Sequence, residues 1–152
     1  MARLFFAGDH AGYEMRQFLI GRLRGLSHEI VDLGSNSATE PCDYPDFALV
    51  AAQRVAAGEG VGILVCGTGM GVSIVANKVP GVRAARCTDT FSARMARAHN
   101  DANVLCLGGW ITGRGLAEDM VRVFLETPFE GGRHQRRVEK ITAIDARRGD
   151  LK

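Results

Sequence analysis

The sequence predicts an α/β fold in which a parallel sheet of five strands lies between two layers of helices. Short apolar runs, each long enough for one strand, alternate with longer stretches of helical composition. All but the second apolar run are followed by glycine or a polar residue and then by a helix signal. Such alternation is typical of right-handed βαβ units, whose parallel strands are covered by helices on both faces.

The expected elements follow one another at regular intervals. Strands are expected at residues 4–7, 29–33, 61–66, 82–85 and 103–107. Helices are expected at about residues 12–25, 46–57, 71–78, 90–98 and 114–126. We find no linker or internal repeat, so residues 1–152 are expected to form a single domain. One sequence does not reveal the order of the strands in the sheet.

A further helix is expected from about residue 133 to 147, after a break at Thr-Pro-Phe-Glu-Gly-Gly. Arg133 and Arg137 would lie one turn apart on a shared face, where two guanidinium groups could bind one anion. Other basic residues crowd the same end of the chain. Such a run is either a solvated helix face or an anion-binding surface, and composition alone leaves both interpretations open.

Composition excludes several classes of protein. Hydrophobic residues make up 46% of the 152 residues and charged residues 24%, which argues against a disordered or fibrous chain. No apolar run is long enough to cross a bilayer, and the first residues become charged too soon for a signal peptide, so we expect a cytoplasmic protein. A formal net charge of +2 is too small to favour a nucleic-acid partner.

The four cysteines are expected to be free thiols. Cys42, Cys66, Cys87 and Cys106 lack the close C-x-x-C spacing of zinc and redox sites, so no metal site is predicted. Cysteines in apolar segments are usually inert and buried. Cys66 differs from the others because a glycine-rich turn follows it directly.

The turn Gly67-Thr68-Gly69-Met70-Gly71 follows a strand and opens a helix. Backbone N–H groups in such a turn bind anions and stabilise a neighbouring thiolate. The pattern lacks the second half of a dinucleotide fingerprint and the lysine of a P-loop, which disfavours nicotinamide binding. A tight strand-to-helix turn without a ligand would explain the same glycines.

Other polar residues are expected near this turn. Asp9 and His10 follow the first strand, as Gly67 follows the third, and His99 lies at the end of the fourth helix. We expect both histidines to face the sheet edge that carries Cys66, because ligands of open α/β sheets bind at the carboxyl ends of the strands. Acid–base roles are then favoured over structural ones.

Six ordered segments together resemble type B ribose-5-phosphate isomerases and their galactose-6-phosphate isomerase relatives. They are Ala7-Gly8-Asp9-His10-Ala11-Gly12, Asp43-Tyr44-Pro45, Cys66-Gly67-Thr68-Gly69-Met70-Gly71, Ala76-Asn77-Lys78, His99-Asn100-Asp101-Ala102-Asn103-Val104 and Glu130-Gly131-Gly132-Arg133-His134. The resemblance implies a Rossmann-like α/β/α fold with an extra C-terminal helix, and a homodimer with two shared active sites. Pairing of dimers into tetramers is left open. It also implies aldose–ketose isomerisation of a phosphorylated sugar without metal or cofactor.

The resemblance also implies individual roles. Cys66 would be the base that moves a proton between two carbons, and Thr68 would help to move protons between their oxygens. Asp9 and His99 would open the sugar ring. The substrate-binding residues implied are His10, Arg133 and Arg137 for the phosphate, Asp43 and Tyr44 for the sugar hydroxyls, and Asn100, Gly67, Gly69, Met70 and Gly71 for the sugar and the enediolate.

One departure from the family concerns Trp110. The family has Gly-x-Arg where this chain has Gly108-Gly109-Trp110, and that arginine can reach the phosphate. Trp110 would either pack at a subunit interface or reshape the far end of the pocket, and Arg114 is a candidate to replace the missing arginine.

Three alternative functions remain open. The first is isomerisation of another sugar phosphate, such as allose 6-phosphate, galactose 6-phosphate or a tetrose phosphate. The second is a sugar-phosphate sensor without turnover. The third is a nucleic-acid module built on the basic C-terminal residues, which would show a steep salt dependence of binding.

Overall fold

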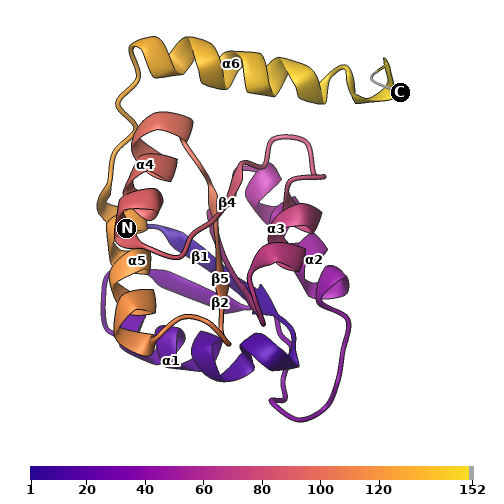
Figure 1. The fold of residues 1–152 in the computed structure, drawn as a ribbon, viewed down its shortest axis with the longest axis vertical. Coiled ribbons are helices and arrows are strands. Elements are labelled where there is room, and N and C mark those ends of the chain that lie inside the picture. The colour runs from indigo at the N-terminus through magenta and orange to yellow at the C-terminus, as the bar shows by residue number, and fades with distance from the viewer. Residues whose placement is uncertain (151–152) are drawn as a thin grey trace.

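The computed structural model describes residues 1–150 and confirms the predicted fold class (Figure 1). The strands are β1 Arg3–Gly8, β2 Glu29–Asp32, β3 Val61–Cys66, β4 Ala84–Arg86 and β5 Val104–Gly108. They form one sheet in the order β2-β1-β3-β5-β4, and every neighbouring pair is parallel. Strands β3 and β5 are therefore neighbours although β4 lies between them in the sequence.

The helices occupy the predicted positions within a few residues. They are α1 Tyr13–Leu23, α2 Tyr44–Ala56, α3 Met70–Ala76, α4 Thr90–Asn100, α5 Arg114–Glu126 and α6 Arg133–Asp145, with short 3-10 helices at His10–Gly12 (η1) and Arg148–Asp150 (η2). The predicted domain extends to residue 152, and its last two residues lie outside the described part. No helix within residues 1–150 has both the length and the apolar composition needed to span a membrane.

The core consists of two apolar layers, one on each face of the sheet. Alternate residues of β1 serve the two layers: Leu4 and Phe6 pack with α1, α4 and α5, whereas Phe5 and Ala7 pack with α2 and α3. These four side chains are fully buried. Burying a Phe side chain contributes roughly 1.5–3 kcal/mol, so β1, which lies beside the central strand β3, is a rigid base for the loop that follows it.

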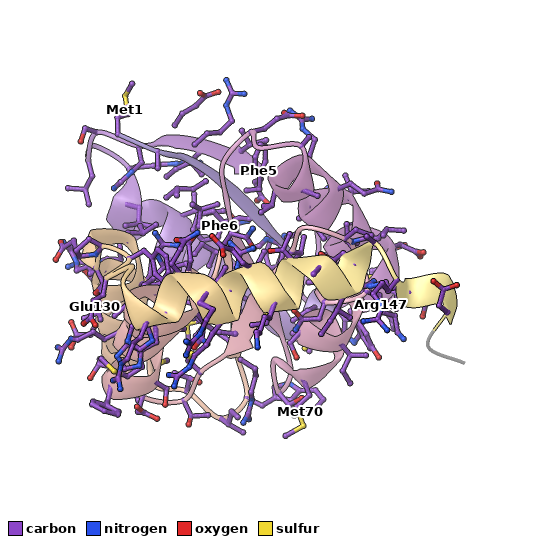
Figure 2. All side chains as sticks on the ribbon, turned by 90° about the horizontal axis from the view of Figure 1, so that it is seen from above. Met1, Phe5, Phe6, Met70, Glu130 and Arg147 are labelled. Carbon is purple, nitrogen blue, oxygen red and sulfur yellow. The ribbon has the colours of Figure 1, made fainter. Side chains whose placement is uncertain are left out.

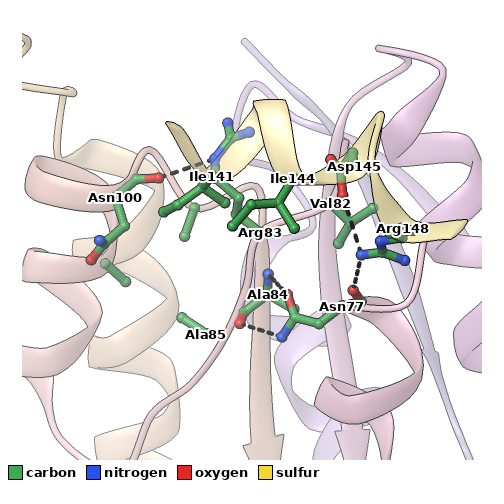
Figure 3. Close-up of a pocket in the computed structure, with 12 residues that line it drawn as sticks. Asn77, Val82, Arg83, Ala84, Ala85, Asn100, Ile141, Ile144, Asp145 and Arg148 are labelled. Atoms are coloured by element: carbon green, nitrogen blue, oxygen red, sulfur yellow. Dashed lines mark hydrogen bonds and ion pairs between the residues drawn. The ribbon is translucent and has the colours of Figure 1, made fainter. Parts of the chain in front are cut away.

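Helix α6 stands apart from the three layers and crosses one end of the molecule above α4 (Figures 1 and 2). Its buried contacts come from His134 and Val138. Near its far end, Asp145 accepts a hydrogen bond from the Gly81 N–H at 2.8 Å. Arg148, just beyond the helix, donates to the Asn77 carbonyl at 2.6 Å (Figure 3). The helix is thus held at both ends.

Between these attachments, α6 covers a hollow of about 330 Å³ (Figure 3). Apolar side chains of α6, Ile141 and Ile144, face Val82 and Ala84 across it. The hollow lies beside the start of β4, at the amino-terminal edge of the sheet.

Candidate active site

A polar pocket of about 260 Å³ lies at the carboxyl ends of β1 and β3. Its lining residues come from the loops after these two strands, from the start of α2 and from the loop after β5. They are Asp9, His10, Ala11, Tyr44, Cys66, Gly67, Thr68, Gly71 and Trp110. Seven of these were predicted as site residues, Trp110 was noted as a departure from the family that could reshape the pocket, and Ala11 was given no role.

Cys66 is the last residue of β3, and only 4% of its surface is exposed. The Gly69 N–H donates to its sulfur at 3.2 Å. Gly69 has a φ of +77°, a left-handed conformation that favours glycine and turns this N–H back toward the thiol. A hydrogen bond to the sulfur stabilises the negative charge of a thiolate. Because α3 has only seven residues, the nearby N–H groups of the turn matter more here than a long helix dipole.

Two other cysteines are unsuited to act as bases. Burial raises the pKa of Cys87 to about 11, and full burial raises the pKa of Cys106 well above its ordinary value. Both therefore stay protonated near neutral pH. Cys42 is partly exposed, but it lies outside the pocket, with its sulfur 4.0 Å from Nδ1 of His10.

The loop after β1 presents an acid and a histidine to the pocket. The buried Asp9 carboxylate accepts the Gly12 N–H at 3.1 Å and caps η1. Nδ1 of His10 accepts the Cys42 N–H at 3.2 Å. A neutral His10 that accepts at Nδ1 carries its proton on Nε2, so it can donate a hydrogen bond to an anion.

The separation of this loop from Cys66 is fixed by backbone contact. A Cβ atom at Gly12 would lie 2.0 Å from the Val65 carbonyl oxygen, well inside van der Waals contact. Val65 directly precedes Cys66. The absence of a side chain at Gly12 therefore brings the Asp9-His10 loop against the strand that carries the thiol.

Thr68 and Tyr44 also line the pocket. The Thr68 hydroxyl accepts the Met70 N–H at 3.3 Å, and its carbonyl accepts Nε of Arg86 at 3.0 Å, which ties the turn to β4. The Tyr44 ring lies against Gly71. Asp43 precedes α2 and is exposed, but it does not line the pocket.

The expectation that His99 shares this sheet edge is wrong for a single chain. Helix α4 starts after the carboxyl end of β4 and runs back past the sheet, so His99 and Asn100 lie beside the start of β5 at Val104. They are thus at the amino-terminal edge, opposite Cys66. The connecting helices run antiparallel to the strands, so the end of a helix lies at the opposite edge of the sheet from the end of a strand.

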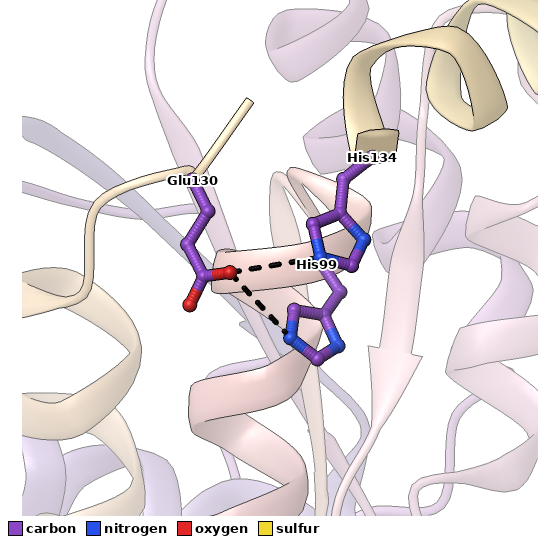
Figure 4. Close-up of side chains that lie close together, drawn as sticks. All are labelled: His99, Glu130 and His134. Atoms are coloured by element: carbon purple, nitrogen blue, oxygen red, sulfur yellow. Dashed lines mark ion pairs between the residues drawn. The ribbon is translucent and has the colours of Figure 1, made fainter. Parts of the chain in front are cut away.

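At that edge, His99 belongs to a cluster with Glu130 and His134 (Figure 4). The two imidazole rings stack with centroids 4.1 Å apart and an angle of 9° between their planes. One Glu130 oxygen lies 3.8 Å from Nε2 of His99 and 3.6 Å from Nε2 of His134. Parallel rings direct their lone pairs along separate planes, so the cluster is not preformed for one metal ion.

Glu130 and His134 were not among the predicted site residues, although both belong to the same family segment as Arg133. Burial lowers the pKa of His134, and the charges of His99 and Arg133 add to this effect. His134 is therefore neutral near pH 7 and serves as an uncharged platform for the His99 ring.

The two arginines expected to bind phosphate are on this side as well. Arg133 and Arg137 are exposed and lie one turn apart on α6, as predicted. Asn100 is also exposed, and its carbonyl accepts Nε of Arg83 at 3.0 Å. The predicted site residues thus fall into two groups at opposite edges of the sheet.

Trp110 belongs to the Cys66 group. Its backbone N–H donates to the Gly67 carbonyl at 3.0 Å, and the backbone N–H of the neighbouring Gly109 donates to the Cys66 carbonyl at 2.8 Å. Arg114 does not approach the pocket, because its guanidinium lies over the Phe18 ring, 5.2 Å from the centroid. Arg114 is therefore not placed to replace the missing arginine.

Comparison with known proteins identifies the family. Residues 4–141 match the sequence profile of the family described as Ribose/Galactose Isomerase. The chain belongs to this family. It is 45% identical to the ribose-5-phosphate isomerase B of Escherichia coli K12 over 149 residues, which cover 97% of this chain and 99% of that protein.

Solved structures of family members agree with the fold. Ribose-5-phosphate isomerase B of Clostridium thermocellum superposes with a TM-score of 0.93 at 46% identity, covering 96% of this chain and 99% of the other. The Mycoplasma genitalium enzyme with bound ribulose-5-phosphate gives 0.91 at 41% identity, covering 95% and 96%. The resemblance found in the six segments is confirmed.

Proposed function

We propose that this chain is a ribose-5-phosphate isomerase that interconverts ribose 5-phosphate and ribulose 5-phosphate. The proposal is supported by relatives of that name at 45% identity and by a related structure with bound ribulose-5-phosphate. The observation in this chain that carries it is the Cys66 sulfur, which accepts a backbone N–H inside a pocket that also contains Asp9, His10 and Thr68. Such a pocket can take a proton from carbon and stabilise the oxyanion that results.

We infer the following sequence of proton transfers. Asp9 acts with His99 of the partner subunit to open the furanose ring. The Cys66 thiolate removes the proton from C2, and the N–H groups of the Gly67–Gly71 turn stabilise the enediolate. Thr68 transfers a proton between the two oxygens, and Cys66 returns its proton to C1. No net oxidation or reduction occurs, so the proposed steps call on neither a cofactor nor a metal ion.

We also propose that the active unit is a homodimer. The Cys66 group and the His99 group lie at opposite edges of one chain, so a complete pocket requires a second copy. Large apolar side chains are exposed after three neighbouring strands, which gives that copy a surface to cover. They are Met70 and Ile74 after β3, Phe91 after β4, and Trp110 and Ile111 after β5.

In such a dimer, each pocket would contain His99, Asn100, Arg133 and Arg137 of the partner subunit. The two arginines and His10 would then hold the phosphate by charge-assisted hydrogen bonds. Asp43, Gly69 and Met70, which border the pocket without lining it, remain proposed contacts to the sugar.

We place the protein in the cytoplasm. All four cysteines are free, which fits a reducing compartment. Cell fractionation followed by an immunoblot would test this placement.

A panel of aldose phosphates, assayed for ketose formation with a chelator present, tests the proposed reaction. Ribose 5-phosphate should give the highest kcat/KM, ahead of allose 6-phosphate, galactose 6-phosphate and erythrose 4-phosphate. A different preferred substrate would reassign the reaction within the family. Binding of ribose 5-phosphate without turnover would indicate a sensor, and loss of turnover with the chelator would contradict the metal-free mechanism.

A further inference from the structure

We propose that Trp110 is a specificity-determining residue that limits the length of the sugar phosphate this site accepts. The inference rests on the proposed function, because it assumes that the reacting carbons lie at Cys66. It concerns the wall of the pocket rather than the groups that carry out the proton transfers.

The wall is defined by a second hollow beside the Cys66 pocket. This hollow has a volume of about 350 Å³, and its lining includes Glu14 and Thr39. His10, Ala11 and Trp110 line both spaces, so these three residues separate them. Ala11 contributes only a methyl group, and the Cys42 N–H holds His10 in place. The indole is therefore the largest part of the partition.

The indole is held in place by the loop that follows Cys66. A Cβ at Gly67 would lie 2.6 Å from the Trp110 ring, so the ring is in direct contact with this glycine. Backbone hydrogen bonds from Gly109 to Cys66 and from Trp110 to Gly67 join the two loops. The wall thus keeps a fixed position relative to the Cys66 sulfur.

Trp110 is not held there by a core role. In a single chain, 73% of its surface is exposed, so its truncation should remove little core packing. Its exposed side belongs to the surface that the second copy would cover, and its contact with Gly67 places the same ring at the edge of the pocket.

The wall fixes how far a substrate can extend. With its reacting carbons at Cys66 and its phosphate at His10, a five-carbon sugar phosphate ends beside the indole. An aldose phosphate that is longer by one CHOH unit would press its phosphate against the ring. Behind the ring, the Glu14 carboxylate would repel a phosphate that entered the second hollow.

Substrate selectivity provides the first test. The ratio of kcat/KM for allose 6-phosphate to that for ribose 5-phosphate should rise at least tenfold in Trp110→Ala, because the two hollows merge. Adding Glu14→Gln to this variant should raise the ratio again, whereas Glu14→Gln alone should leave it unchanged. Trp110→Phe keeps a large ring and should retain the wild-type ratio. An unchanged ratio in a folded Trp110→Ala that still isomerises ribose 5-phosphate would overturn the proposal.

Intrinsic fluorescence provides a second test that does not depend on turnover. Trp110 is the single tryptophan of the chain, so all indole emission reports on the wall. Saturating ribose 5-phosphate should shift this emission and reduce its quenching by acrylamide, and it should do so in Cys66→Ala as well. Unaltered emission and quenching under conditions where binding is measured calorimetrically would overturn the proposal, even if Trp110→Ala is inactive.

The two proposals fail differently. Absence of ribose 5-phosphate isomerisation in the wild-type protein would overturn the proposed function, and this inference with it. Normal wild-type isomerisation with an unchanged ratio in Trp110→Ala would overturn this inference alone.

Discussion

The pocket around Cys66 is buried and well ordered by contacts within one chain, whereas the cluster around His99 is more exposed and less tightly held. The Cys66 sulfur is almost fully buried, and the surrounding loops are fixed by backbone hydrogen bonds to β3 and β5. By contrast, Arg133, Arg137 and Asn100 are exposed, and the groups around His99 meet at long distances. One region is organised within a single chain, and the other presents groups outward.

This difference follows from the topology of the fold. Loops after parallel strands gather at the carboxyl edge, whereas the ends of the connecting helices gather at the amino edge. A site that uses both kinds of residue cannot close within one small sheet. In the proposed dimer, Cys66 and Thr68 of one subunit would move the protons, and Arg133 and Arg137 of the other would bind the phosphate together with His10.

The largest expected effect is on the Cys66 side. Cys66→Ala should lower kcat by a factor on the order of 10² or more, because a positioned base is lost. Substrate binding should persist, since the phosphate-binding groups are untouched. Solvent deuterium should no longer enter the product, which mass spectrometry of the recovered sugar phosphate would measure.

Cys87→Ala is the matched control, because it removes a buried thiol that stays protonated at neutral pH. Its kcat should remain near that of the wild type. A Cys66→Ala protein with near-normal kcat would show that another group is the base.

Mixing two inactive variants tests the division between subunits. Cys66→Ala and His99→Ala chains should each be inactive, but a heterodimer of the two has one pocket with both groups intact. After random exchange in an equal mixture, roughly a quarter of the pockets should be active. Isotope-coded subunits and native mass spectrometry would establish that exchange took place. Complete exchange without recovered activity would mean that each pocket is built from one chain.

The exposed arginines should affect binding more than chemistry. Arg137→Ala should raise KM for ribose 5-phosphate about tenfold or more, because a charge-assisted hydrogen bond to the phosphate is lost, with a smaller change in kcat. Arg136→Ala removes an adjacent exposed charge from another face of α6 and serves as the control. Equal KM values in the two variants would indicate that α6 is only a solvated surface.

The smallest effect should come from the stacked histidines. Burial of the imidazole lowers the pKa of His134, so the folded state favours its neutral form. The stability gained from this residue is then present above its ordinary pKa of about 6.5 and is lost as the pH falls through the lower folded value. His99, Arg133 and Arg137 oppose the added charge, and Glu130 favours it.

We therefore expect the Tm to fall on acidification from pH 7.5 to 5, and to fall less in His134→Gln. Differential scanning fluorimetry of both proteins in the same buffers would measure the difference. Identical pH profiles would remove His134 as a source of acid sensitivity.

The sequence predicted the fold because its signals are local. Strands β1, β3 and β5 are apolar runs followed by a turn, and the glycine turn after Cys66 marks the carboxyl edge without reference to the rest of the chain. The strand order and the position of His99 are not local properties. Both depend on how far each helix runs across the sheet. The expectation that His10 and His99 share one edge was wrong for this reason.

Contacts between residues far apart in the sequence could not be predicted either. No spacing rule pairs Glu130 and His134 with His99, since a loop and the start of α6 bring them together only after the chain folds. Likewise, the sequence shows that Trp110 follows β5, but only the pairing of β5 with β3 reveals that the indole lies over Gly67.

The close contact at Gly12 has a consequence for how this enzyme can change. Gly12 lies so close to the Val65 carbonyl that there is no room for even a methyl group. The gap between the Asp9-His10 loop and Cys66 therefore cannot be adjusted in small steps by substitution at this position. Any other residue there would displace the whole loop. Variation in substrate preference is therefore expected to accumulate in the walls of the pocket, while the spacing of its acid and its thiol stays constant among functional descendants.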